Sequence, residues 1–152
     1  MRLSIRYKQT QNKKSFKVRE DIAKGLGNSK EKVNDPLTEK IIKACFKVHN
    51  ELGAGFVERV YQNALLIELS KDGLKAIKEP QFNAVYEGEI VGSFFVDIIV
   101  EGKVILELKS LSGDVPSFMK YQILSYLKAS GIKTGLLVNF GNKSCQIRRF
   151  VY

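Results

Sequence analysis

Three ionisable residues stand inside two otherwise apolar stretches of this sequence. The segment "FFVDIIVEGKVILELKS", residues 94 to 110, contains Asp97, Glu107 and Lys109, and each of the three has an aliphatic neighbour in the chain. Side chains alternate between the two faces of a strand, so Glu107 and Lys109 share a face. Carboxylates beside an ammonium group can hold a divalent cation and assist attack of water on a phosphodiester. These residues are therefore our first candidates for a catalytic site.

The position of Asp97 depends on the turn "EGK". If the turn is a three-residue loop, Val100 lies opposite Val104 and Asp97 lies opposite Glu107 on the same face. A two-residue loop at Gly102-Lys103 would shift the register by one and turn Asp97 to the other face. The residues alone leave both registers open.

The proposed chemistry follows from the cost of placing two carboxylates together. Buried carboxylates repel each other when ionised and lose hydration, so a divalent cation would relieve the conflict. Asp97, Glu107 and the backbone carbonyl of Leu108 form an all-oxygen ligand set, which suits Mg²⁺ or Mn²⁺ and not Zn²⁺. Lys109 would orient or deprotonate a water, or offset negative charge in the transition state. The alternative is an exposed Glu107-Lys109 pair with Asp97 ending a strand, but the apolar flanks favour burial.

Helices and strands must position these residues. One apolar helix face is predicted from the dipeptide Asp35-Pro36 onward, a second helix from about Phe56 to Ser70, and a third from about Ser117 to Ser130. The segments "QFNAVY", "EIVGSFFVDIIV" and "KVILELKSL" predict three strands in a meander, and "KTGLLVNF" and "SCQIRRFVY" predict two more. A strand, helix and strand of this length form a right-handed crossover with parallel strands. We expect a single α/β sandwich with a mixed sheet.

Further polar residues are expected near the site. Glu58 shares a helix face with Tyr61 and points inward or along the rim, although an acid in a first helical turn also complements the helix dipole. Gln122 and Tyr126 lie one turn apart on the crossover helix and would touch a metal-bound water or a phosphate, or act only as buried polar caps.

The net charge of +9 is concentrated near the start of the chain. Residues 1–36 hold ten Lys and Arg against four acids, which leaves only +3 for residues 37–152. We predict a poorly ordered basic extension over 1–36 and a folded domain over 37–152. The extension would attract phosphates without regard to sequence, or it is a solubilising segment or the product of a mis-set start codon.

The other residues with reactive side chains suggest structural roles. Cys45 and Cys145 form no disulfide framework or metal-ligand cluster, and both are predicted to be small buried hydrophobes. His49 is expected to pack in its helix. The sequence contains neither a run of 18 apolar residues nor a signal peptide. We expect a cytoplasmic protein without a membrane partner.

The segment "GFVERVY" carries a recognisable pattern. Gly55, Glu58 and Tyr61 match G-x-x-E-x-x-Y, and the surrounding blocks "VHNELGAGFVERVYQNALLIEL", "FFVDIIVEGKVILELKS", "YQILSYL" and "TGLLVNFG" occur in the order found in the GxxExxY protein family. Over residues 37–152 the chain resembles that family, which is placed in the PD-(D/E)XK nuclease superfamily. The resemblance implies a restriction-endonuclease-like three-layer sandwich of αβββαβ order, with helices on both faces of the sheet.

The resemblance also implies a role for each candidate. The metal-binding Asp of the superfamily falls on Asp97 and its E-x-K on Glu107 and Lys109, which places Asp97 and Glu107 on one face. Its first-helix acid, a further candidate metal ligand, falls on Glu58, and its later polar helix residue falls on Gln122. The chain departs from the pattern in carrying a valine where a proline usually precedes the Asp, and in residues 1–36, which have no counterpart.

The predicted function is hydrolysis of phosphodiester bonds by a Mg²⁺- or Mn²⁺-dependent nuclease. We favour DNA over RNA as substrate, and the sequence leaves open whether the enzyme is an endonuclease or an exonuclease. A domain of this size would engage two strands as a homodimer, although no patch in the sequence identifies the interface. The alternative is a non-catalytic module on the same fold that binds nucleic acid or protein, because the domain lacks the dense basic stripe expected around a duplex.

Overall fold

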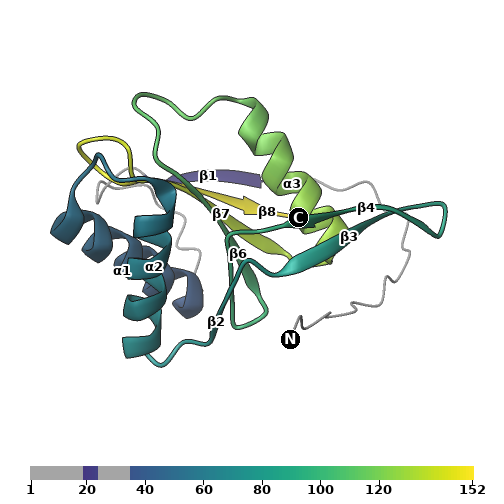
Figure 1. Cartoon of the computed structure of the whole chain (residues 1–152), viewed down its shortest axis with the longest axis horizontal. Coiled ribbons are helices and arrows are strands. Elements are labelled where there is room, and N and C mark those ends of the chain that lie inside the picture. The colour runs from purple at the N-terminus through teal and green to yellow at the C-terminus, as the bar shows by residue number, and fades with distance from the viewer. Residues whose placement is uncertain (1–18, 24–34) are drawn as a thin grey trace.

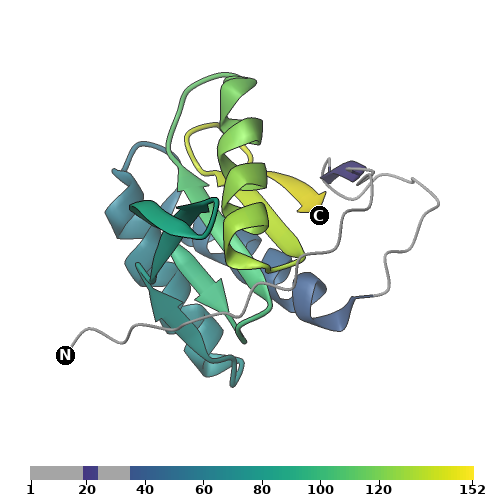
Figure 2. The ribbon, with the colours of Figure 1, turned by 90° about the vertical axis from the view of Figure 1, so that its right-hand side faces the viewer.

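The computed structural model describes residues 19–23 and 35–152, and it has three layers with a mixed sheet in the middle (Figures 1 and 2). Two helices lie on one side of the sheet and one helix on the other, as predicted. The elements in chain order are β1 (Arg19–Ala23), α1 (Pro36–Leu52), α2 (Glu58–Lys71), β2 (Ala76–Lys78), β3 (Gln81–Tyr86), β4 (Glu89–Phe95), β5 (Ile98–Val100), β6 (Val104–Lys109), α3 (Phe118–Ser130), β7 (Thr134–Asn139) and β8 (Gln146–Val151).

The central sheet has the order β1-β8-β7-β6-β5-β2. Strands β6 and β7 are parallel and are joined through α3, which confirms the predicted crossover. The other neighbouring strands are antiparallel. Strand β6 therefore has partners on both sides and is buried along most of its length, which explains its nearly continuous apolar sequence.

Each face of the sheet has its own hydrophobic core. Leu106 and Leu108 pack on the face covered by α1 and α2, together with Tyr61. Ile105 packs on the opposite face against Ile123 of α3. Alternation along β6 consequently directs Glu107 and Lys109 toward the α3 face. Figure 2 shows α3 in front of the sheet and the other two helices behind it.

The predicted three-strand meander is wrong in one respect. The stretch read as one strand, 89–100, is two strands, and β4 pairs only with β3 in a separate hairpin that projects from the body (Figure 1). The break lies at Val96 and Asp97, opposite Glu79 and Pro80. Glu79 has a φ of 50°, and Pro80 has no backbone N–H with which to continue the ladder. Strand β2, which ends directly before Glu79 and Pro80, was not predicted.

The folded domain begins slightly before the predicted boundary. Asp35 caps α1 by accepting a hydrogen bond from the backbone N–H of Leu37, and it also pairs with Arg149 of β8 at 3.5 Å. Residues 19–23, inside the predicted basic extension, pair as β1 with β8. Residues 1–18 and 24–34 of that extension lie outside the described residues.

Two predictions on reactive side chains are confirmed. Cys45 and Cys145 are buried free thiols, and burial raises the pKa of the Cys145 thiol to about 12. His49 is buried, and its Nε2 lies 2.8 Å from the carbonyl oxygen of Asn142, so it serves packing. Within the described ranges, no helix is long and apolar enough to cross a bilayer.

Candidate active site

The register of β5 and β6 brings the two predicted metal ligands together. Val100 pairs with Val104 and Ile98 with Leu106, so the turn is the three-residue loop. One further step along both strands sets Asp97 opposite Glu107. The backbone pairing of β5 with β6 ends at Ile98 and Leu106. Beyond it, Oδ2 of the Asp97 side chain accepts a hydrogen bond from the backbone N–H of Leu108 at 2.6 Å. Asp97 is thereby held against the strand that carries Glu107.

Glu107 and Lys109 form a buried ion pair at the end of β6. Lys109 Nζ lies 3.0 Å from Glu107 Oε1, and both side chains are almost wholly removed from solvent. The other carboxylate oxygen, Oε2, is also buried and finds no hydrogen-bond partner within the part of the chain that the structure describes. A buried carboxylate oxygen without a donor is costly, and a cation would satisfy it.

The pKa values of the site residues also show that the buried carboxylates are costly to ionise. Burial, and then the charge of Asp97, raise the pKa of Glu107 to about 7. Burial also raises the pKa of Asp97, although the N–H of Leu108 opposes the rise. Burial by itself lowers the pKa of Lys109, but the charge and hydrogen bond of Glu107 outweigh it, and the pKa is raised. Near neutral pH the lysine is therefore charged while Glu107 is poised between its two forms.

The first turn of α2 supplies the third acid. Glu58 is exposed rather than turned into the core, and its charge raises the pKa values of Asp97, Glu107 and Lys109. It therefore lies at the rim of the site, one of the two positions predicted for it. One turn later, Gln62 Nε2 donates to the backbone carbonyl of Asp97 at 2.9 Å and ties α2 to the break between β4 and β5.

The other signature residues hold the loop before α2. Gly55 has a φ of 113°, a conformation that favours glycine. The hydroxyl of Tyr61 donates to the Gly53 carbonyl at 2.6 Å and accepts the N–H of Phe56 at 3.2 Å. The ring of Tyr61 stacks on Phe140 at 4.5 Å, which anchors it in the core. Tyr61 thus fixes the loop that delivers Glu58, and it does so from the helix that follows.

Helix α3 forms one wall of the site. Gln122 Nε2 donates to the Tyr126 hydroxyl at 2.9 Å, and the Tyr126 ring stacks on Phe94 at 4.5 Å. Burial and then the charge of Glu107 raise the pKa of Tyr126. Gln122 and Tyr126 therefore lie toward the carboxylates, and no direct contact with Asp97, Glu107 or Lys109 joins them among the hydrogen bonds of the described residues.

Several residues that support the site escaped the sequence analysis. The buried side chain of Asn139, at the end of β7, accepts the N–H of Leu111 and donates to its carbonyl, each at 2.9 Å. Gly141 packs so closely on Leu111 that a Cβ atom there would lie 2.3 Å from the Leu111 carbonyl oxygen. Both hold the chain that leaves β6 after Lys109. The sequence signal that could have indicated Asn139 is the amide at the end of the apolar run "LLVN".

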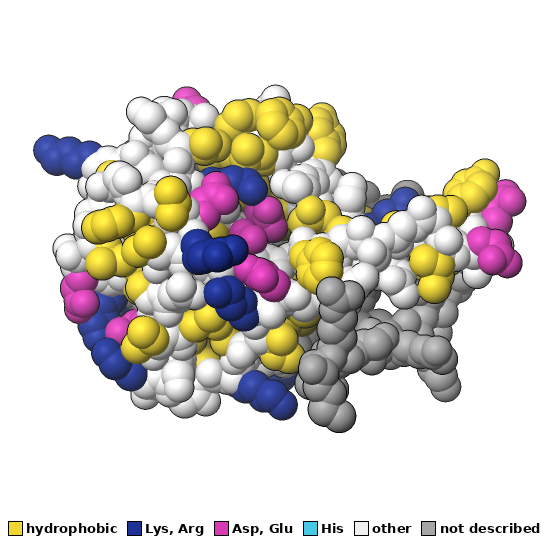
Figure 3. Space-filling view, in the orientation of Figure 1, with side chains coloured by type: hydrophobic (Ala, Val, Ile, Leu, Met, Phe, Trp, Pro, Cys, Tyr) yellow, Lys and Arg dark blue, Asp and Glu magenta, His cyan; other side chains and the backbone are white. Residues whose placement is uncertain are grey.

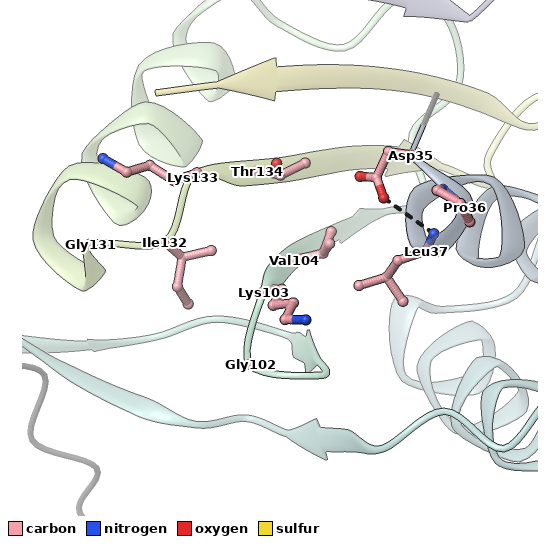
Figure 4. A pocket seen from close by; sticks show the side chains of 10 residues that line it. All are labelled: Asp35, Pro36, Leu37, Gly102, Lys103, Val104, Gly131, Ile132, Lys133 and Thr134. Carbon is pink, nitrogen blue, oxygen red and sulfur yellow. Dashed lines mark hydrogen bonds between the residues drawn. The ribbon is translucent and has the colours of Figure 1, made fainter. Parts of the chain in front are cut away.

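In Figure 3 acidic and basic side chains gather in the middle of the face, with hydrophobic side chains around them. A pocket of about 500 Å³ lies elsewhere, between the start of α1, the loop before β6 and the loop after α3 (Figure 4). Val104, at the opposite end of β6 from Lys109, lines that pocket. The carboxylates are therefore not part of it.

Asp97 and Glu107 could bind a divalent cation only as two members of a small set of ligands. Among residues 35–152 and the short strand β1, no three His, Cys, Asp or Glu side chains come together as a metal cluster. The predicted site needs only two carboxylates, with a backbone carbonyl and water completing the set. The unpartnered Oε2 of Glu107 and the adjacent Asp97 fit that smaller set.

Comparison with known proteins identifies the family. The model of the PD-(D/E)XK nuclease superfamily matches residues 35–150, which is most of the chain. The chain therefore belongs to the PD-(D/E)XK nuclease superfamily, and its mixed sheet between helices agrees with that fold. No curated protein and no solved structure matched the chain.

Proposed function

We propose that this protein is a metal-dependent nuclease that hydrolyses phosphodiester bonds of DNA. The observation that carries the proposal is the buried oxygen Oε2 of Glu107, which lacks a donor while a second carboxylate, Asp97, stands opposite. Such a pair has little reason to persist as packing alone, because an apolar pair of similar volume would avoid both the repulsion and the desolvation.

Asp97 and Glu107 would hold Mg²⁺ or Mn²⁺ together with the Leu108 carbonyl. The N–H of Leu108 is directed at Asp97, and the N–H and C=O of one strand residue point to the same side. The Leu108 carbonyl is accordingly expected on the Asp97 side of β6. When bound, the ion would neutralise the carboxylates and polarise a phosphoryl oxygen. Glu58, at the rim, would contribute through water.

Lys109 would stabilise negative charge on the phosphate. In the metal-free protein its raised pKa keeps the ammonium group protonated at neutral pH, so it can donate a hydrogen bond to a phosphate oxygen. Glu107 fixes its position through the 3.0 Å contact. Gln122 and Tyr126 would orient water or a phosphate oxygen from the α3 side, with the Phe94 ring holding Tyr126 in place.

We also infer that the chain belongs to the GxxExxY branch of the superfamily. Gly55, Glu58 and Tyr61 match its signature, and the structure provides a physical reason for each. Gly55 adopts the positive φ of the loop, Tyr61 pins that loop, and Glu58 is delivered to the rim of the carboxylate site.

Cleavage assays with purified full-length protein test the proposal. Wild-type protein should cut DNA in Mg²⁺ or Mn²⁺ and not in EDTA, and both Asp97→Ala and Lys109→Ala should lose at least about a hundredfold in rate. Glu89→Ala, an exposed acid on the projecting hairpin, is the matched control and should keep full activity. Cleavage that survives both site substitutions would refute the assignment.

The second candidate is a non-catalytic module that binds nucleic acid. It is favoured by the concentration of positive charge in residues 1–36, where +6 of the total of +9 resides. Binding with a steep salt dependence, lost on deletion of residues 1–18 and unaccompanied by cleavage with any divalent ion, would support it over the nuclease.

A further inference from the structure

Three phenylalanine rings are exposed around the candidate active site, one from each of three separate elements. Phe56 precedes α2, Phe95 ends β4, and Phe118 begins α3, with exposed fractions of 46%, 54% and 64%. We call these three residues the aromatic rim. Rings of this size normally bury their faces, and three around one polar site suggest a partner with flat apolar groups.

Two members of the rim are tied to the carboxylate strands. The carbonyl of Phe56 accepts the hydroxyl of Ser110 at 2.6 Å, and Ser110 directly follows Lys109. Phe95 ends β4 two residues before Asp97, and its exposed ring therefore lies directly before the break at Val96 and Asp97. Its neighbour Phe94 points the other way and packs in the core under α3.

Phe118 belongs to the row of α3 that faces the site. It lies four residues before Gln122 and eight before Tyr126, and residues at this spacing are neighbours on one helix face. Tyr126 senses the charge of Glu107, which places that row on the side of the carboxylates. In Figure 3 hydrophobic side chains over α3 border the central group of acidic and basic side chains.

The charge of the domain argues against a duplex as the favoured ligand. Residues 37–152 carry a net charge of only +3, and Glu58 and Glu79 add negative charge beside Asp97. A duplex offers a dense row of phosphates and hides the faces of its bases. A single strand exposes base faces, which stack on aromatic side chains without regard to sequence. The aromatic rim and the small net charge of residues 37–152 both match a single strand better than a duplex.

We propose that the site takes single-stranded DNA, whose unpaired bases stack on Phe56, Phe95 and Phe118 while the backbone crosses Asp97, Glu107 and Lys109. The inference rests on the proposed function, because it names the substrate class of the same site. The aromatic rim selects single strands over duplexes, and Asp97, Glu107 and Lys109 act on the phosphate.

Binding in EDTA tests the proposal without requiring catalysis. The full-length protein is titrated into a fluorescein-labelled strand of about 16 nucleotides, or into the same sequence as a duplex, at moderate salt, and anisotropy is recorded. Phe56→Ala, Phe95→Ala and Phe118→Ala should each weaken single-strand binding about tenfold and leave duplex binding nearly unchanged. Phe118→Trp, which keeps a stacking surface, should bind the single strand as well as wild type does.

Tyr86→Ala is the matched control, because Tyr86 is 66% exposed and lies at the far end of the hairpin (Figure 1). It should leave binding unchanged. Equal effects of the rim substitutions on single strand and duplex, or no effect on either, would overturn the inference. It would also fall if the rim variants abolished self-association in light scattering while retaining single-strand affinity, because the rim would then be a contact between copies.

The outcomes separate this inference from the proposed function. If wild-type protein shows rim-dependent binding of single strands but no cleavage with Mn²⁺, the nuclease assignment fails and the binding inference stands. If it cleaves single strands and duplexes equally, and the rim substitutions alter neither rate, the nuclease assignment stands and the inference fails.

Discussion

Replacement of Glu107 by glutamine should change how the stability of the metal-free protein depends on pH. In the folded protein the pKa of Glu107 is raised from 4.5 to about 7. Between these values the unfolded chain has released the proton and the folded protein still holds it. The unfolded state therefore binds fewer protons, and the free energy of unfolding falls as the pH rises. This contribution to stability is fully present below about pH 4.5 and is lost above about pH 7.

The size of the effect follows from the shift. Each pKa unit corresponds to about 1.4 kcal/mol, so ionisation of Glu107 should cost the folded state about 3 kcal/mol. The glutamine side chain of the Glu107→Gln variant would be neutral in both states and would lack this loss. The difference in unfolding free energy, variant minus wild type, should thus increase by about 3 kcal/mol as the pH rises from about 4 to about 9. In the wild-type protein Lys109 titrates above this range, because Glu107 raises its pKa.

Urea unfolding followed by circular dichroism in EDTA measures this difference. Glu89→Gln, on the exposed start of β4, is the matched control and should leave the pH dependence of wild type in place. A difference between Glu107→Gln and wild type that stays flat across the range would refute the reasoning. It would mean that burial and the charge of Asp97 do not keep Glu107 protonated in this pH range.

Two other substitutions test the parts that hold the site. Gly141→Ala should destabilise the fold by about 2 kcal/mol or more, because the added Cβ meets the backbone of Leu111 and not a movable side chain; thermal unfolding measures this. Gly92→Ala, with open space around it, should change the melting temperature far less, and an equal change would contradict the argument. Tyr61→Phe should cost about 1 to 2 kcal/mol in urea unfolding through the lost bond to Gly53, and an unchanged free energy would show that this hydroxyl does not hold the loop.

Much of the site could be predicted because strands obey a simple alternation. Spacing by two put Glu107 and Lys109 on one face, and a loop with glycine in its centre set the register that brings Asp97 opposite Glu107. The sequence left two registers open because three-residue and two-residue turns at "EGK" both suit hairpins. The structure has the longer loop, with Glu101 at a φ of 53°.

The break in the meander could not be predicted from one strand alone. Apart from Asp97, the second half of the run 89–100 is apolar, so its own sequence favours one strand. The interruption comes from the partner, where Pro80 cannot donate to the ladder and Glu79 turns the chain. Beyond that break, the side chain of Asp97 bonds to β6 in place of the backbone ladder.

The supporting residues were missed for a related reason. Asn139 ends an apolar strand, where a polar residue is usually the start of a loop, and its role becomes visible only when Leu111 lies beside it. Such contacts join segments far apart in the chain, and local patterns do not report them.

Anomalous diffraction from crystals soaked in Mn²⁺ would show whether Asp97 and Glu107 bind a divalent cation. We predict a peak between the carboxylates of Asp97 and Glu107, within coordination distance of both, that disappears in Glu107→Gln. A protein that cleaves DNA with Mn²⁺ but shows its peak away from these carboxylates, or keeps the peak in Glu107→Gln, would contradict it.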